Sequence, residues 1–250
     1  MDPLAEQRLE GLRNGAGRKG PRNQMSRIAI MQPYLLPYLG YFRLMVDVDA
    51  LVLGDVQQFP RRGWVHRNRL PDDTGQPGWL TLPLKPQPLG TRIGEIVFAE
   101  GAQVTLGRNM ARFAACRSPN AVTAPMVATL AALEGSPLAV IRRLLEQVAG
   151  RLGLSAPLLL QSEFHDPAAE GLSPTEQIIE VCQALGAREY VNAPGGRALY
   201  DAADFARHGV RLLFHDPYAG PTDSILQRLT CESPEQLRRE VIDSATVQPG

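Results

Sequence analysis

Polar residues and glycines follow four short apolar runs of the sequence, where the side chains of a binding cleft would be expected. They are Gln32 and Tyr34, Asp55 and Gln57, Asn192 with Gly195 and Gly196, and His215. If the runs are parallel strands, these residues share the carboxyl edge of one sheet, outside which ligands bind in open α/β sheets. Gly195 and Gly196 can present backbone amides to an anion, and His215 can act as a general base. The pattern therefore predicts a polar cleft at that edge.

A cluster of arginines lies between the second and third of these runs. Residues 61–69 (RRGWVHRNR) hold four arginines, one histidine and Trp64, and no acidic residue. Arginine binds phosphate or carboxylate through two parallel hydrogen bonds, and tryptophan can stack beside it. The segment is typical of a clamp for a phosphorylated or nucleotide-linked ligand. The alternative is an arginine-rich loop exposed to solvent.

Three tyrosines, Tyr34, Tyr38 and Tyr41, lie within residues 32–41 (QPYLLPYLGY). Each offers a flat apolar ring with a hydroxyl at its rim, which suits stacking against a sugar or a base. The alternative is a tight loop in which two prolines and a glycine only shape a turn. We expect the three tyrosines to bind substrate.

The composition limits the classes of partner and site. The 26 basic and 26 acidic residues give a formal net charge of zero, so no nucleic-acid partner is expected. Cys116, Cys182 and Cys231 form no Cys-x-x-Cys pair, and the two His-Asp-Pro tripeptides (165–167 and 215–217) point adjacent side chains in different directions. We therefore expect no metal site, and the sequence identifies no cofactor. No stretch suits a membrane span or a signal peptide, so a cytoplasmic protein is expected.

Apolar patterning predicts the elements that position these residues. Residues 27–32 and 50–55 predict buried parallel strands, joined by a short crossover helix over 39–46. Residues 79–84 and 91–98 predict two further strands, with Pro83 moving the first toward a sheet edge. Residues from about 103 to 155 predict a helical layer, in which Ser136 and Pro137 begin the last helix.

The C-terminal third alternates helices with strands. Ser173, Pro174 and Glu176 predict a capping box that begins a helix ending at Gly186. Residues 189–193 and 210–215 predict strands, and residues 198–208 predict a helix between them. The alternation predicts an α/β fold with a mainly parallel sheet and the helical segment as an insertion.

The expected organisation is one domain over residues 25–250. Residues 1–24 lack aromatic residues and end in a Gly/Arg/Lys-rich stretch, so they predict a disordered N-terminal extension. Met25 is then an alternative start codon to Met1.

The ordered motifs of residues 26–228 resemble the WbqC-like family, bacterial proteins often encoded among O-antigen and surface-polysaccharide genes. The resemblance rests on residues 30–33 (IMQP) with Pro37, Gly40, Tyr41 and Phe42; residues 55–57 (DVQ) with Gly63, Trp64, Arg67 and Arg69; residues 79–83; and residues 190–192 (YVN) with Gly195, Gly196, Leu199 and Tyr200. Gly54 and Gln227 stand where members of the family usually carry acidic residues. The family has been proposed to include a glycine transferase acting in O-antigen synthesis.

The resemblance implies a transferase that moves a glycyl or other aminoacyl group onto a nucleotide-linked or lipid-linked amino sugar, beside other polysaccharide-biosynthesis enzymes. Such a transfer needs a base for the amine and donors for the oxyanion. The implied residues are Asp55 or His215 as the base; Asn192, Gly195 and Gly196 as oxyanion donors; Arg62, Arg67 and Arg69 as a diphosphate clamp; and Ser224 in the substrate-binding stretch 223–227. Because two acidic positions differ, a nucleotide or nucleotide-sugar binding module without catalysis is the alternative.

A second likeness is to the nucleotidylyltransferases, in which a His-x-Gly-His loop leads from the first strand to a helix. The corresponding residues 38–41 are YLGY, so both histidines are replaced. This likeness implies a Rossmann-like, nucleotidylyltransferase-like sheet with a nucleotide pocket. A nucleotidylyltransferase-like enzyme is therefore a further alternative.

Overall fold

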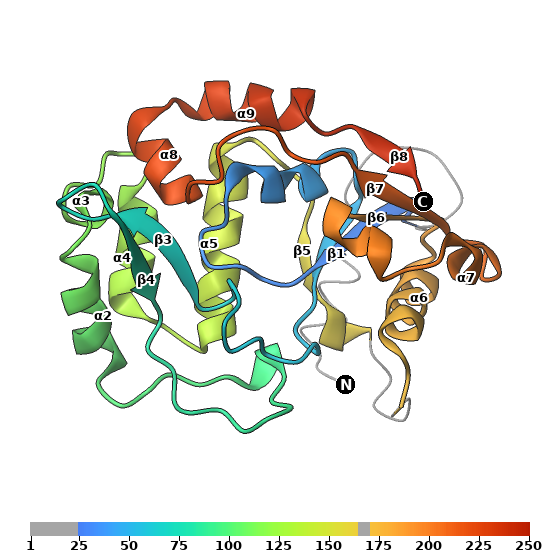
Figure 1. Ribbon diagram of the computed structural model, residues 1–250, viewed down its shortest axis with the longest axis horizontal. Helices are drawn as coiled ribbons and strands as arrows, with labels where there is room; N and C mark the ends of the chain where they lie inside the picture. The colour runs from blue at the N-terminus through green and yellow to red at the C-terminus, as the bar shows by residue number, and fades with distance from the viewer. Residues whose placement is uncertain (1–24, 165–170) are drawn as a thin grey trace.

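The computed structural model describes residues 25–164 and 171–250, and its centre is one six-stranded sheet (Figure 1). The strand order is β5-β2-β1-β6-β7-β8, and every neighbouring pair is parallel except β7 and β8. The strands are β1 (Arg27–Met31), β2 (Ala50–Leu53), β5 (Leu158–Leu160), β6 (Glu189–Asn192), β7 (Arg211–His215) and β8 (Val247–Pro249). The predicted mixed α/β class with a mostly parallel sheet is confirmed. The predicted extension over 1–24 lies outside the described residues.

Side chains of the strands alternate between two hydrophobic cores, one on each face of the sheet. Ile28 and Ile30 of β1 lie in the core that contains α6, whereas Ala29 between them lies in the core that contains α5. A parallel sheet covered on both faces needs strands that are apolar throughout, and β2 is buried at all four of its positions. This is why continuous apolar runs, rather than alternating ones, predicted these strands.

Helices cover both faces of the sheet (Figure 1). The helices α6 (Pro174–Leu185) and α7 (Ala202–Ala206) contribute buried side chains to the core on one side. The 3-10 helix η1 (Leu39–Met45), α5 (Pro137–Arg151), α8 (Ile225–Cys231) and α9 (Pro234–Asp243) contribute to the core on the other side. The predicted capping box at α6 is present, because Ser173 and Glu176 exchange hydrogen bonds between side chain and backbone.

A second unit extends beyond α5 (Figure 1). It contains the antiparallel hairpin of β3 (Arg67–Pro71) and β4 (Pro77–Thr81), together with α2 (Ala102–Met110), α3 (Ala114–Arg117) and α4 (Ala124–Ala132). The Asn68 side chain fixes this hairpin to the segment after β1, because its amide donates to the carbonyls of Leu35 and Leu36 at 3.0 and 2.6 Å. The hairpin is thereby held beside the chain that leaves the carboxyl end of β1.

Several predicted elements differ in the structure. The strand prediction over 91–98 is wrong: the segment contains a 3-10 turn, η2 (Ile93–Glu95), because the amide of Gly94 donates to Asp55 and not to a strand partner. The predicted strand over 79–84 ends at Thr81, two residues before Pro83, which lacks a backbone donor. The crossover helix is the 3-10 helix η1, and the predicted helix over 198–208 is the turn η4 (Pro194–Ala198) followed by α7.

Within residues 25–164 and 171–250, no helix combines the length and the apolar character needed to cross a membrane.

Candidate functional site at the carboxyl edge of the sheet

The direction of strand succession reverses between β1 and β6. From β1 the sheet continues through β2 to β5 on one side, and through β6 to β7 on the other. Loops at such a reversal leave in opposite directions and open a crevice at the carboxyl ends of the strands. Gln32, Asp55 and Asn192 follow or end three adjacent strands there, which lie about 4.8 Å apart. These three predicted residues therefore share one edge.

Asp55 is the best-defined polar group at this edge. It is only 4% exposed, two residues beyond the end of β2. Ser162 holds both of its carboxylate oxygens: the Ser162 amide donates to Oδ1 at 2.9 Å, and the Ser162 hydroxyl donates to Oδ2 at 2.6 Å. A carboxylate has about four acceptor positions, so two remain for a substrate or water. The carboxylate is thus fixed in place without being saturated.

Two glycines allow the chain to pack closely around Asp55. A Cβ atom at Gly54 would overlap the side-chain amide of Gln57, so glycine lets Gln57 fold over the end of β2. The amide of Gly94 donates to the Asp55 carbonyl at 2.8 Å. Gly54 therefore has a packing role in this chain.

The sequence did not reveal the residues that β5 brings to the same edge. Ser162 binds Asp55, and Gln161 beside it is buried, with its Oε1 atom lacking a hydrogen-bond partner among the described residues. Both lie in the turn η3 (Gln161–Glu163) directly after β5. The signal was present as Leu158–Leu160 followed by polar residues, but three residues are too few to identify a strand by periodicity.

Tyr34 and Tyr41 pair near the end of β1. Their ring centroids are 5.6 Å apart, and the Tyr41 hydroxyl donates to the backbone carbonyl of Gln32 at 2.9 Å. Burial raises the pKa of Tyr41, so the phenol stays protonated and keeps this hydrogen bond. Tyr41 is 2% exposed and shapes the loop, whereas Tyr34 is partly exposed beside Gln32. Among the three predicted tyrosines, Tyr34 is the one the structure leaves beside the edge.

Asn192 and the two glycines lie at the end of β6. The Oδ1 atom of Asn192 accepts the amide of Ala193 at 2.7 Å, and a Cβ atom at Gly196 would overlap the Asn192 amide group. The amide of Gly196 donates to the Ala193 carbonyl at 3.0 Å. A Cβ atom at Gly195 would meet nothing within 4 Å. Gly196 is therefore needed for close packing, and Gly195 faces open space.

Three other predicted residues are buried or bound by other parts of the fold. His215 is 2% exposed; its Nδ1 atom contacts the Thr246 carbonyl at 3.2 Å, and its Nε2 atom is buried without a partner among the described residues. Burial lowers the pKa of His215 and favours the neutral ring. The Ser224 hydroxyl donates to Leu36, and Tyr38 pairs with Tyr218 at 5.6 Å. These contacts join the C-terminal segment to the loop after β1.

The arginine cluster is divided among different contacts. The guanidinium carbons of Arg67 and Arg69 lie 4.2 and 4.7 Å from the centre of a Trp79 ring, and Trp64 lies 5.5 Å from Trp79. Arg67 also donates to the carbonyls of Arg62 and Gly63, at 2.9 and 3.3 Å. The guanidinium groups of Arg62 and Arg69 form no hydrogen bond or ion pair within residues 25–164 and 171–250. Cationic and aromatic groups thus form one exposed platform on the hairpin.

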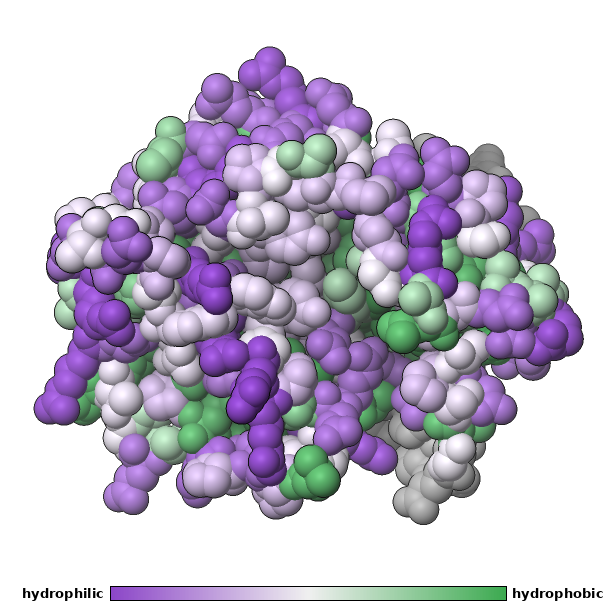
Figure 2. All heavy atoms as spheres, in the orientation of Figure 1, coloured by the Kyte–Doolittle hydropathy of each residue, from purple (hydrophilic) through white to green (hydrophobic). Residues whose placement is uncertain are grey.

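The face seen in Figure 2 is largely hydrophilic, with its apolar residues in small separate groups. Within the described part of the chain, no three His, Cys, Asp or Glu side chains come together in a way that could hold a metal ion. At the sheet edge these residues offer a fixed carboxylate, amide groups and a tyrosine.

Comparisons with known proteins agree with the resemblance seen in the sequence. Residues 32–222 match the WbqC-like protein family. The chain is 28% identical over 205 residues to the uncharacterized protein Rv1507c of Mycobacterium tuberculosis (strain ATCC 25618 / H37Rv). The matched region covers 80% of this chain and 85% of that protein. No solved structure matches the chain. Since the family match spans most of the sheet and the site, the chain belongs to the WbqC-like protein family.

Proposed function

We propose that this protein is a transferase that moves a glycyl or other aminoacyl group onto the amine of a nucleotide-linked or lipid-linked sugar, in the synthesis of O-antigen or another surface polysaccharide. The observation that carries the proposal is the Asp55 carboxylate, buried at the carboxyl edge of a mostly parallel sheet and held through both oxygens by Ser162. An oriented carboxylate with free acceptor positions is what a general base requires.

In the proposed reaction, the sugar amine attacks the carbonyl carbon of an activated acyl donor. A carbon–nitrogen bond forms, the bond from that carbon to the leaving group breaks, and the amine proton moves to Asp55. Asn192 and the Gly195 amide would donate to the oxyanion, because the Gly196 amide is already bound to Ala193. Gln32 and Gln57 would bind sugar hydroxyls, and Tyr34 would stack on the ring.

The proposal places the activated sugar between the sheet edge and the hairpin. We infer a Rossmann-like sheet, in which a nucleotide occupies the crevice at the reversal between β1 and β6. Arg62, Arg67 and Arg69 would hold the diphosphate from the hairpin side, since none of them pairs with an acid among the described residues. Cytoplasmic location and contact with other polysaccharide-biosynthesis enzymes belong to the same proposal.

The test compares three forms of the full chain with nucleotide-linked amino sugars and an activated glycine donor. Mass spectrometry detects the acylated sugar. Asp55→Asn should lower turnover at least ~10²-fold while ligand-induced thermal stabilisation persists, because only the proton acceptor is lost. Asp243→Asn, an exposed change in α9, is the matched control and should retain wild-type turnover. Equal turnover in Asp55→Asn would remove Asp55 from the mechanism.

A binding module without catalysis is the second candidate, and the exposed platform of Arg67, Arg69 and Trp79 favours it. Cations stacked on an aromatic ring can hold a diphosphate with no catalytic group nearby. This function predicts that binding of a nucleotide sugar survives Asp55→Asn and weakens in Arg69→Gln. Product formed by the wild type with any donor would exclude it.

A further inference from the structure

A groove separate from the sheet edge lies between the chain that enters the hairpin and the segment that follows it. Its volume is about 570 Å³, and its lining includes Phe59, Arg61, His66, Lys85 and Gln87. A smaller hollow of about 320 Å³ shares Phe59 and Arg61 with it. Arg61 therefore stands where the two hollows meet. Asp55, Gln32 and Asn192 line neither of them.

The charge of the groove has one sign. Arg61 and Lys85 are the charged residues of its lining, and no acidic residue lines either hollow. Neither cation forms an ion pair within residues 25–164 and 171–250, and Lys85 is the sole lysine of those residues. Cations without an acidic partner that face a groove attract an anion. The hydrogen bonds that the anion accepts replace the hydration that these cations lose.

Hydrogen bonds fix the walls that carry these cations. Arg61 donates to the Gln87 carbonyl at 2.9 Å, and the Gln87 amide donates to the Lys85 carbonyl at 2.8 Å. The backbone amide of Lys85 donates to Val97 at 3.1 Å, and that of Phe59 donates to Thr91 at 2.8 Å. The Arg61 guanidinium and the backbone of Lys85 are thus placed before any ligand binds, which lowers the entropic cost of binding.

The rest of the lining is apolar or flat. Phe59 meets the ring of His66 edge to face at 5.1 Å, and Leu84 and four prolines continue the surface. Leu89, at the outer hollow, is 83% exposed. A ligand made only of charge would leave this surface in water, so an ester with an apolar or aromatic group fits better than a bare inorganic ion.

We propose that this groove binds the phosphate or diphosphate group of a small-molecule ester between Arg61 and Lys85, with the apolar or aromatic part of the ester on Phe59 and the adjoining proline surface. Arginine binds such a group through two parallel hydrogen bonds, and lysine adds a point charge. The site does not depend on the transferase activity, because Asp55 lines no part of it.

A diphosphate ester could be a nucleotide or a prenyl diphosphate, and the choice of probes distinguishes the two. Titration calorimetry of the full chain would use uridine diphosphate, geranyl diphosphate and inorganic pyrophosphate. Tighter binding of geranyl diphosphate than of pyrophosphate identifies a prenyl ester, and tighter binding of uridine diphosphate identifies a nucleotide. Either result supports the groove when the variants below weaken it.

The variants are Arg61→Gln and Lys85→Gln, with Arg239→Gln on the exposed side of α9 as the matched control. Each groove variant should weaken Kd at least ~10-fold, since a charge-assisted contact is lost, and the control and Asp55→Asn should bind as the wild type. Lys85 is exposed, so Lys85→Gln should fold even if Arg61→Gln is less stable. Failure of all three probes to bind saturably overturns the proposal. So does wild-type binding in Lys85→Gln, or binding that is lost only in Arg69→Gln.

Discussion

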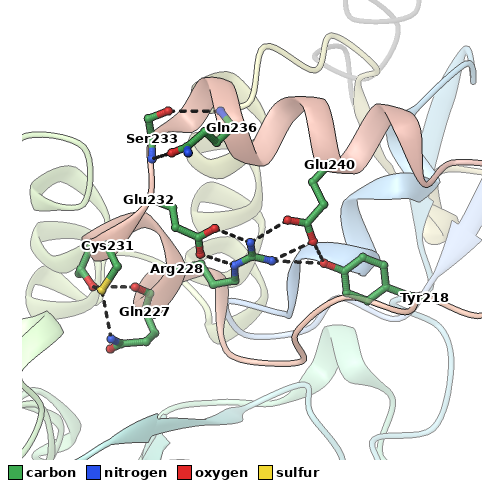
Figure 3. A network of polar contacts seen from close by, with 9 residues as sticks. Tyr218, Gln227, Arg228, Cys231, Glu232, Ser233, Gln236 and Glu240 are labelled. Atoms are coloured by element: carbon green, nitrogen blue, oxygen red, sulfur yellow. Dashed lines mark hydrogen bonds and ion pairs between the residues drawn. The ribbon is translucent and has the colours of Figure 1, made fainter.

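Two arginine-bearing regions of this protein differ in what their guanidinium groups contact. Near the C-terminus, Arg228 is 5% exposed and donates to the carboxylates of Glu232 and Glu240, with the Tyr218 hydroxyl beside it (Figure 3). On the hairpin, Arg67 and Arg69 lie over Trp79 and meet no carboxylate of the described residues.

The difference follows from which residues surround each arginine in the chain. Glu232 lies one helical turn from Arg228, and α9 brings Glu240 to it, so the charge of Arg228 is matched inside the fold. The segment 61–69 contains no acid, and its partner strand β4 contains none. Paired arginines therefore stabilise this fold, and unpaired ones remain available to a ligand.

The largest effect is expected where the charge is buried. Arg228→Gln removes every charged contact of the network and leaves Glu232 and Glu240 facing each other, so unfolding free energy should fall by about 3 kcal/mol. For a chain of this length that lowers Tm by about 6–12 °C. Thermal and urea unfolding measure it, and Arg239→Gln is the control that should change stability by less than ~0.5 kcal/mol. A variant as stable as the wild type would contradict the comparison.

The contrast between paired and unpaired groups also explains what the sequence could predict. The strands β1, β2 and β7 were predictable because each contains an unbroken apolar run. The strand β6 (EYVN) was predictable from its place in the alternation of helices and strands, and α6 from its capping box. The strand β3 was not predictable, because Arg67 and Arg69 occupy its half-buried and exposed positions and only Asn68 and Leu70 are buried. Its pairing depends on β4 and on the anchor that Asn68 makes with the loop after β1.

The candidate site shows the same limit. Asp55 was predicted at the sheet edge because it follows a clear strand, but its partner Ser162 follows a strand of three residues. His215 also ends a predicted strand, and β8 and the Thr246 carbonyl bury it. Local pattern therefore located the edge, whereas contacts between distant segments decided which side chains are fixed at it.

A smaller effect separates two arginines of the same strand. Arg67 bonds two backbone carbonyls of the preceding turn in addition to its position over Trp79, whereas Arg69 has only the ring contact. Arg67→Gln should therefore lower the free energy of unfolding by about 1 kcal/mol, and Arg69→Gln by less than ~0.5 kcal/mol. Urea unfolding of the two variants measures the difference. Equal losses would mean that the turn contacts of Arg67 contribute nothing.

The last effect depends on pH and concerns His66, whose ring lines the groove beside Arg61 and lies near Arg67. Burial, and then the charge of Arg67, lowers the pKa of His66 to about 4. In the unfolded chain the pKa of histidine is about 6.5, so between these two values the unfolded state binds a proton that the folded state does not. Stability that His66 contributes as a neutral ring should therefore be lost as pH falls from about 6.5 toward 4, and His66→Gln should lack that loss.

Urea unfolding at pH 7 and pH 5, for the wild type and His66→Gln, isolates this contribution from the other histidines because they are common to both proteins. As pH falls from 7 to 5, the wild type should lose more free energy of unfolding than His66→Gln does. This difference should shrink when Arg67→Gln is added to both proteins, since one cause of the lowered pKa of His66 is then gone. Adding Arg228→Gln in place of Arg67→Gln should leave the difference between the wild type and His66→Gln unaltered, because Glu232 and Glu240 neutralise the charge of Arg228. If adding Arg67→Gln leaves the difference between the wild type and His66→Gln unchanged, Arg67 exerts no field on His66, and the contrast between the two regions is then one of packing alone.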